Sequence, residues 1–127
     1  MNKQKRNKMI GKSLLVFLVC WLIFLCGHVI YSHIRIRKAN ALWLEGRHEE
    51  AVEIYYATIT IGATSENQGV IYGRMIDYEL SRNNPSGAQK VLQLRKEWGG
   101  TGNVFEGIPL PVCETEQGKA MVKGLTR

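Results

Sequence analysis

Residues 13–34 read SLLVFLVCWLIFLCGHVIYSHI, and this stretch decides the organisation of the chain. Its 22 residues include no Asp, Glu, Lys or Arg. As an α-helix the stretch would span roughly 33 Å, which is enough to cross the ~30 Å hydrocarbon core of a bilayer. No polar stripe divides the run before Gly27, which disfavours the core helix of a soluble domain. The sequence therefore predicts one transmembrane helix.

Cationic residues flank this segment on both sides. Residues 1–12 contain five cations and no acid, and Arg35, Arg37 and Lys38 follow the segment directly. The whole chain has a formal net charge of +6, but residues 39–127 contain nine Lys and Arg against eleven Asp and Glu. A nucleic-acid-binding domain carries its basic face on the folded part. We therefore expect no nucleic-acid partner.

The same charges bear on membrane topology. A short basic stretch before the first apolar segment favours a cytoplasmic N-terminus. A cleaved secretory signal is the alternative, but its apolar core spans only about 7–15 residues, and the A-x-A match at Ala39–Ala41 lies beyond three cations. We expect an uncleaved signal-anchor in a bacterial inner membrane: residues 1–12 form a basic cytoplasmic tail, residues 13–34 span the bilayer, and the C-terminal domain lies on the far side.

Four helical stretches are predicted after the apolar run, so the expected fold class is all-α. They cover about residues 33–45, 48–60, 65–82 and 86–98. Gly46 suits the left-handed position that ends the first stretch. Ser65–Gln68 and Ser86–Gln89 have the spacing of capping boxes that open the third and fourth. Gly69 and Gly73, one turn apart, indicate a close backbone approach by a neighbouring helix.

The last 29 residues, 99–127, contain six Gly and two Pro. This composition predicts an irregular tail that carries no core and either wraps the helices or awaits a partner. A short helix near Glu116–Lys123 is the one regular element expected there.

Two stretches 37 residues apart share a pattern. Gly46 is followed five positions later by Ala51, and Asn83 is followed five positions later by Ala88. Ala39 lies seven residues before Gly46, and small residues at such places let paired helices approach closely. Helix–turn–helix units at nearly this period are typical of helical repeats.

The stretch with Gly46, Glu49, Glu50, Ala51 and Tyr55 resembles the turn and second helix of a tetratricopeptide repeat (TPR). The resemblance covers about 60 of the 127 residues, and the second unit keeps only its alanine clearly. It implies a degenerate, two-repeat TPR-like domain over residues 35–98. Its repeat-packing residues would be Ala39, Gly46, Ala51 and Ala88.

The match to the family is incomplete. His48 stands where the family has an aromatic residue, Thr58 stands where it has a small alanine, and no Pro closes the first unit. An ordinary bundle of helical hairpins is the alternative. Because about three repeats are normally needed for stability, two units would need support from the first helix, the tail or another subunit.

The sequence offers little for catalysis or metal binding. Cys20 and Cys26 lie in the apolar run, and Cys113 stands alone in the tail, where it would be free or pair between chains. His28 and His33 are five residues apart and do not share a helix face. We expect no enzyme activity, no catalytic residue, no cofactor and no metal site.

The function expected from these features is that of a membrane-anchored scaffold or adaptor. It would hold one or more unidentified partner proteins near the bilayer, and self-association is a further option. The partner-binding or core residues would be Leu42, Tyr55, Tyr72 and Tyr78. The alternative is a small accessory subunit of a larger membrane complex that binds through its transmembrane helix. The packing row would be Leu14, Leu18, Trp21, Leu25 and His28.

Overall fold

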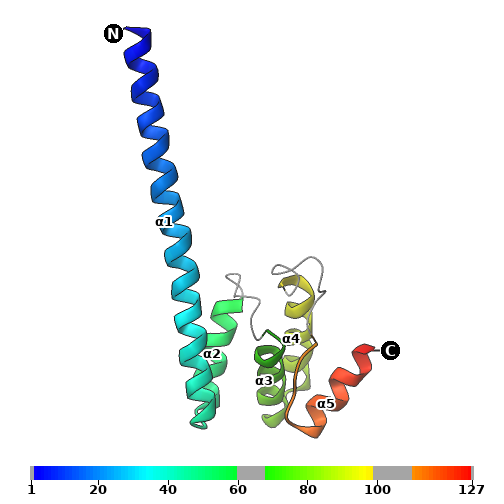
Figure 1. The fold of residues 1–127 in the computed structure, drawn as a ribbon. Helices are drawn as coiled ribbons and strands as arrows, with labels where there is room; N and C mark the ends of the chain where they lie inside the picture. Colours follow the sequence, from blue (N-terminus) through cyan, green and yellow to red (C-terminus); the bar gives the residue numbers. More distant parts are fainter. Residues whose placement is uncertain (1, 60–67, 99–109, 127) are drawn as a thin grey trace. The chain divides into compact units, whose positions relative to one another are not determined.

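The computed structural model describes residues 2–59, 68–98 and 110–126, and these ranges contain helices and no strand (Figure 1). The α-helices are α1 (Lys3–Leu44), α2 (His48–Ile59), α3 (Gln68–Ser81), α4 (Pro85–Trp98) and α5 (Glu116–Lys123), and a 3-10 turn, Gly124–Thr126, follows α5. The predicted all-α class is confirmed. The chain forms two compact units, residues 1–31 and 32–127.

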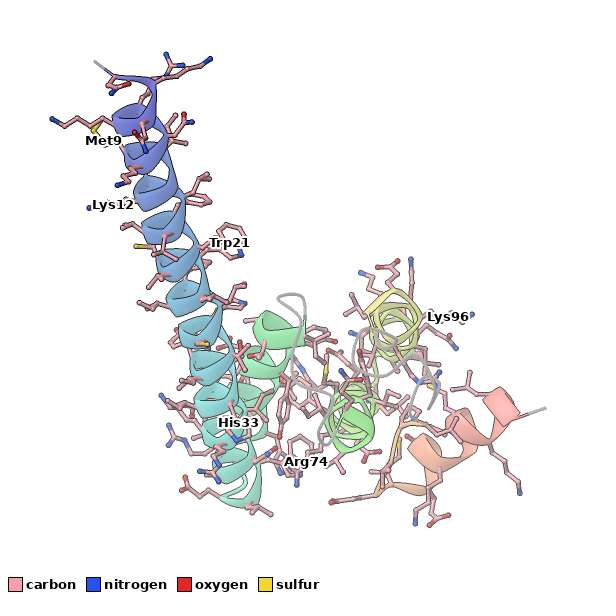
Figure 2. The ribbon with its side chains drawn as sticks, turned by 45° about the horizontal axis from the view of Figure 1, so that its top comes forward. Met9, Lys12, Trp21, His33, Arg74 and Lys96 are labelled. Atoms are coloured by element: carbon pink, nitrogen blue, oxygen red, sulfur yellow. The ribbon has the colours of Figure 1, made fainter. Side chains whose placement is uncertain are left out.

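The first unit consists of the N-terminal part of α1. In the described part of the chain, α1 is the one helix long and apolar enough to cross a membrane. All side chains from Lys3 to Gly27 are exposed, and Figure 2 shows Trp21 projecting outward. The basic residues from Lys3 to Lys12 are helical and continue directly into the apolar stretch. A helix that is apolar all round needs an apolar environment.

The second unit begins with the last turns of α1. Within it, α2 packs on α3, and α3 packs on both α4 and α5. The buried apolar residues of α1 to α4, together with Cys113, form one core. The buried core residues are Ile36, Ala39, Leu42, Trp43, Ala51, Val52, Tyr55, Ile59, Ile71, Tyr72, Met75, Ile76, Ala88, Val91, Leu92 and Cys113.

A Schellman motif ends α1. Gly46 has a φ of +83°, its N–H donates to the Trp43 carbonyl at 3.0 Å, and the Arg47 N–H donates to the Leu42 carbonyl at 2.9 Å. These two bonds satisfy carbonyls that the helix end leaves without a partner. The left-handed helix end predicted at Gly46 is confirmed.

The same motif ends α3, 37 residues further along the chain. Asn83 has a φ of +54°, its N–H donates to the Leu80 carbonyl at 3.0 Å, and the Asn84 N–H donates to the Glu79 carbonyl at 2.9 Å. Asparagine tolerates this left-handed conformation better than most residues with a Cβ atom. The two turns, which lie 37 residues apart in the sequence, therefore have the same geometry.

The capping box predicted at Ser86–Gln89 is wrong. Helix α4 begins at Pro85, and the side-chain oxygen of Asn84 accepts the Gly87 N–H at 3.1 Å. Asparagine is among the best N-cap residues, and proline suits the first helical position because it has no N–H to satisfy. The other predicted box begins at Ser65, outside the described residues.

The described part of the tail packs against α3, which is the first of the two options predicted for it, and its first residues have no regular secondary structure. We call residues 110–115 the strap. The Val112 N–H donates to the Gly69 carbonyl at 2.8 Å, and a Cβ atom on Gly69 would lie 2.7 Å from the Leu110 carbonyl oxygen. A Cβ atom on Gly73 would overlap the Val112 carbonyl. The close approach predicted for the two glycines is confirmed, but the neighbour is this extended segment and not a helix.

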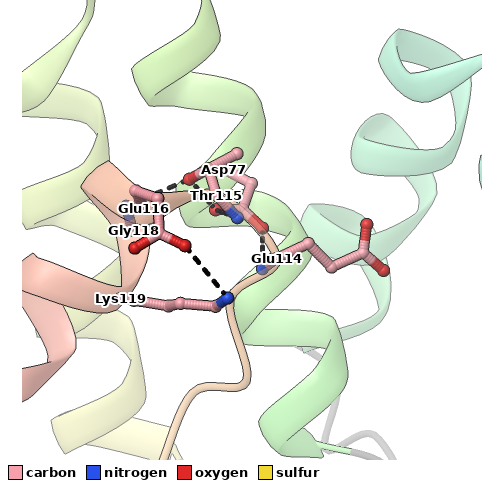
Figure 3. Close-up of polar contacts among 6 residues, drawn as sticks. All are labelled: Asp77, Glu114, Thr115, Glu116, Gly118 and Lys119. Carbon is pink, nitrogen blue, oxygen red and sulfur yellow. Dashed lines mark hydrogen bonds and ion pairs between the residues drawn. The ribbon is translucent and has the colours of Figure 1, made fainter.

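A buried carboxylate holds the end of the strap (Figure 3). Asp77 of α3 accepts the Glu114 N–H at 2.7 Å and the Thr115 hydroxyl at 2.5 Å. The same hydroxyl accepts the Gly118 N–H at 3.0 Å and so caps α5, which occupies Glu116–Lys123 as predicted. These contacts show how an extended segment passes directly into a helix.

The strap also contributes to the core, contrary to the expectation for the tail. Cys113 is buried, and its thiol lies 3.8 Å from the Gly73 carbonyl oxygen. Burial, together with the nearby charge of Asp77, raises the pKa of this thiol to about 12. In this position Cys113 packs inside its own chain and is not presented for pairing with another chain.

Candidate functional site

Two polar features of the second unit are candidates for function, and the first is a cluster around Arg74. One guanidinium nitrogen, Nη1, donates to the Asn40 side-chain oxygen and to the Tyr55 hydroxyl, both at 2.9 Å. Tyr55 in turn donates to Asn40 at 2.6 Å. The guanidinium lies 5.5 Å from the centre of the Trp43 ring, on which the His48 ring stacks at 3.9 Å.

The Arg74 cluster joins α1, α2 and α3, as the position of Arg74 in Figure 2 illustrates. Burial raises the pKa of Tyr55, and the hydrogen bond from Arg74, together with its charge, offsets part of that rise. The Nε of Arg74 is the one buried side-chain nitrogen or oxygen without a partner in the described ranges. With its hydrogen bonds directed inward, this cluster positions the helices and presents little to a ligand.

The second feature is a groove of about 520 Å³ that α2, the end of α3 and α4 form together. We call it the α2–α4 groove. Its polar lining includes Tyr56, Glu79, Asn84, Lys90, Gln93 and Glu97. A Cβ atom on Gly87, which also lines the groove, would lie 2.5 Å from atoms of Asn84 and Glu79.

Hydrogen bonds order the acidic side chains of the groove. Glu79 accepts the Tyr56 hydroxyl at 3.2 Å and the Asn84 amide at 2.8 Å, and Glu97 accepts the Gln93 amide at 3.1 Å. Burial, followed by the charge of Glu79, raises the pKa of Tyr56, which therefore keeps its proton at neutral pH. The groove offers carboxylates, amides and the Lys90 ammonium group, a set suited to hydrogen-bonded recognition of a polar segment.

The structure places the four residues predicted as partner-binding or core in two environments. Leu42, Tyr55 and Tyr72 are buried. Tyr78 is partly exposed, and its hydroxyl accepts a hydrogen bond from the Arg82 guanidinium at 2.9 Å. None of the four lines the α2–α4 groove. The four predicted repeat-packing residues also differ, since Ala39, Ala51 and Ala88 are fully buried and Gly46 forms a turn.

The sequence analysis missed the groove residues because they are ordinary polar residues on helix surfaces. Asn84 had one usable signal, since an Asn directly before a Pro is a strong helix-start pattern. Glu79 and Tyr56 are 23 residues apart in the sequence, and nothing local indicates that they meet. Among the described residues, no group of three His, Cys, Asp or Glu side chains is arranged to hold a metal ion.

No protein-family model, curated protein or solved structure gives a significant match to the chain. Any inference about function therefore has to start from the geometry of the helices and their surfaces.

Proposed function

We propose that this protein is a non-enzymatic, single-pass membrane protein whose helical unit holds a partner protein near the bilayer. The observation that carries the proposal is the bare surface of the apolar stretch of α1, none of which is buried against described residues. Exposing such a surface to water is costly, whereas lipid accommodates it. Confinement near the membrane raises the effective concentration of the helical unit for other membrane components.

In this proposal the helical unit is a degenerate pair of TPR-like hairpins. The support is the recurrence of one turn geometry at Gly46 and Asn83, each followed five residues later by a fully buried alanine. Repeat units of this kind present extended surfaces to partner proteins. The partner surface that we assign is the α2–α4 groove, because several of its polar lining residues, among them Lys90, Gln93 and Glu97, are exposed.

A site-specific cross-link in native membranes tests this assignment. A photoreactive residue at Gln93 should capture a partner, and Lys90→Glu should reduce the yield several-fold by reversing a charge in the groove. Lys119→Glu makes the same change in charge on α5, away from the groove, and should leave the yield unchanged. Equal losses from both variants, or no cross-linked partner at native expression, would count against a groove-bound partner.

The proposed topology has residues 1–12 in the cytoplasm and the helical unit on the far side of a bacterial inner membrane. The support is the basic stretch at the start of α1. Reporter domains fused at each end should give opposite signals. Extraction with alkaline carbonate should leave the full chain in the membrane, and its release would contradict the anchor itself.

An accessory subunit of a larger membrane complex is the second candidate, and a row of rings on α1 favours it. The ring centres of Phe17 and Trp21 are 6.4 Å apart, those of Trp21 and Phe24 are 6.5 Å apart, and those of Phe24 and His28 are 6.4 Å apart. Such a face suits packing against another transmembrane helix. Replacing residues 13–34 with an unrelated span discriminates, because the scaffold would keep its partner and the subunit would lose it.

A further inference from the structure

We infer that the N-terminal turns of α1 form a binding face for anionic phospholipid headgroups. This inference rests on the proposed membrane anchor. Lys5, Lys8 and Lys12 define the face, which we call the lysine face.

The three lysines share one side of a helix. Their spacing of three and four residues places side chains one above the other when the backbone is helical, and α1 is helical from Lys3 onward. Each of the three is exposed, and Figure 2 shows Lys12 projecting from α1. Lys3 and Arg6, also three residues apart, lie on a different side. The cations are therefore divided between two faces.

Among the described residues, no carboxylate forms an ion pair with the lysine face. The first acidic residue of the whole chain is Glu45, so α1 contains no carboxylate. The ion pairs of the described residues join Arg47 to Glu45 and Glu50, and Lys119 to Glu116. A concentration of positive charge without internal compensation attracts external anions, and beside a bilayer the available anions are lipid phosphates.

Helix continuity fixes the depth of these lysines. Because residues 3–12 belong to the same helix as the span, each residue before Ser13 lies ~1.5 Å further from the hydrocarbon. Lys12 then lies at its edge, Lys8 about 7.5 Å out and Lys5 about 12 Å out. The headgroup layer of one leaflet is roughly 5–7 Å thick, so Lys12 lies inside it and Lys8 lies at its outer margin. These two are the principal contacts, and only the long side chain of Lys5 can reach back toward the layer.

The test uses the full chain in nanodiscs that contain equal amounts of phosphatidylglycerol and phosphatidylcholine. After mild detergent extraction, mass spectrometry measures the ratio of the two lipids retained by the protein. The wild-type chain should retain phosphatidylglycerol in excess. The double variant K8Q/K12Q should lower that excess by at least about fivefold. Both leaflets hold both lipids, so orientation does not affect the result.

Two further variants separate a defined face from net charge. K3Q/R6Q makes the same change in charge at the other cations, and the retained excess should change by less than about twofold. The variant N2K/Q4K/K8Q/K12Q restores the wild-type net charge farther from the hydrocarbon and should not restore the excess. A loss from K3Q/R6Q equal to that from K8Q/K12Q, or full recovery on restoring the charge, would overturn the inference.

The remaining arms identify the source of the phosphate and isolate the anchor. Inorganic phosphate should lower the excess no more than chloride at the same ionic strength, since the face binds lipid; a specific loss with phosphate would overturn this. If the chain stays in purely neutral nanodiscs but shows no phosphatidylglycerol excess in the mixed nanodiscs, only the lysine face is refuted. A chain that leaves neutral nanodiscs refutes the membrane anchor on which the face depends.

Discussion

The two hairpins of the helical unit share their turns but differ in what completes them. The first consists of the end of α1 with α2, and the second of α3 with α4. The first is joined to its neighbour by the Arg74 cluster, whereas the second is covered by the strap, which Asp77 holds. Local turn chemistry thus recurs along the chain, while the contacts that stabilise each hairpin come from distant segments. Four experiments test this difference.

The largest effect is expected from Gly73→Ala, which acts on the second hairpin. The added methyl group would overlap the backbone of Val112, so the strap has to move away from α3. We expect a loss of about 3 kcal/mol in the free energy of unfolding, measured by chemical denaturation in detergent. Gly27→Ala adds the same group where no atom lies within 4 Å and should have little effect. Similar losses from both would contradict the close approach.

The next effect concerns the cluster that joins the first hairpin to α3. Tyr55→Phe removes a buried hydroxyl that contacts both Asn40 and Arg74, and it should cost about 1–2 kcal/mol in unfolding free energy. Tyr78→Phe removes a hydroxyl from the second hairpin, where its partner Arg82 is exposed, and should cost less than about 0.5 kcal/mol. The reverse order would show that the Arg74 cluster contributes little.

The two turns themselves should respond differently to substitution. Gly46→Ala places a Cβ atom at a φ of +83° and should destabilise by about 1 kcal/mol, although nothing lies within 4 Å of that atom. Asn83→Gly keeps the left-handed conformation without strain and should change stability by less than about 0.5 kcal/mol. Both values come from denaturation curves of the full chain. A neutral Gly46→Ala would contradict the turn geometry.

The smallest effect is a pH dependence confined to the strap. The pKa of the Cys113 thiol is about 12 in the folded chain and lower in the unfolded chain, so the unfolded state loses its proton first. The stabilisation is complete below about pH 8 and is lost as the pH rises from there to about 12. At pH 9 we expect a loss of less than about 1 kcal/mol, which Cys113→Ser should remove. At neutral pH the thiol is protonated in both states, so its ionisation contributes no difference in stability between the two proteins. Parallel curves of unfolding free energy against pH through about pH 10 would contradict the prediction.

Much of the helical architecture follows from local signals in the sequence. The apolar run before Arg35, the left-handed Gly46 and the short helix Glu116–Lys123 each depend on residues close together in the chain. The start of α4 is also encoded locally, at Asn84 and Pro85, rather than at the predicted Ser86. The candidate groove was not predictable in this way, because Tyr56 meets Glu79 only after α2 and α3 have packed.

The all-α class and the one span-length apolar helix follow from the sequence, because apolarity and backbone preference act over a few neighbouring residues. Only the tertiary structure decided the fate of the tail. The partners of Asp77 lie 37 and 38 residues away, and Cys113 is buried against Gly73, 40 residues away. Glycine in a helix and an isolated cysteine in a tail have many explanations, and only packing in three dimensions selects one.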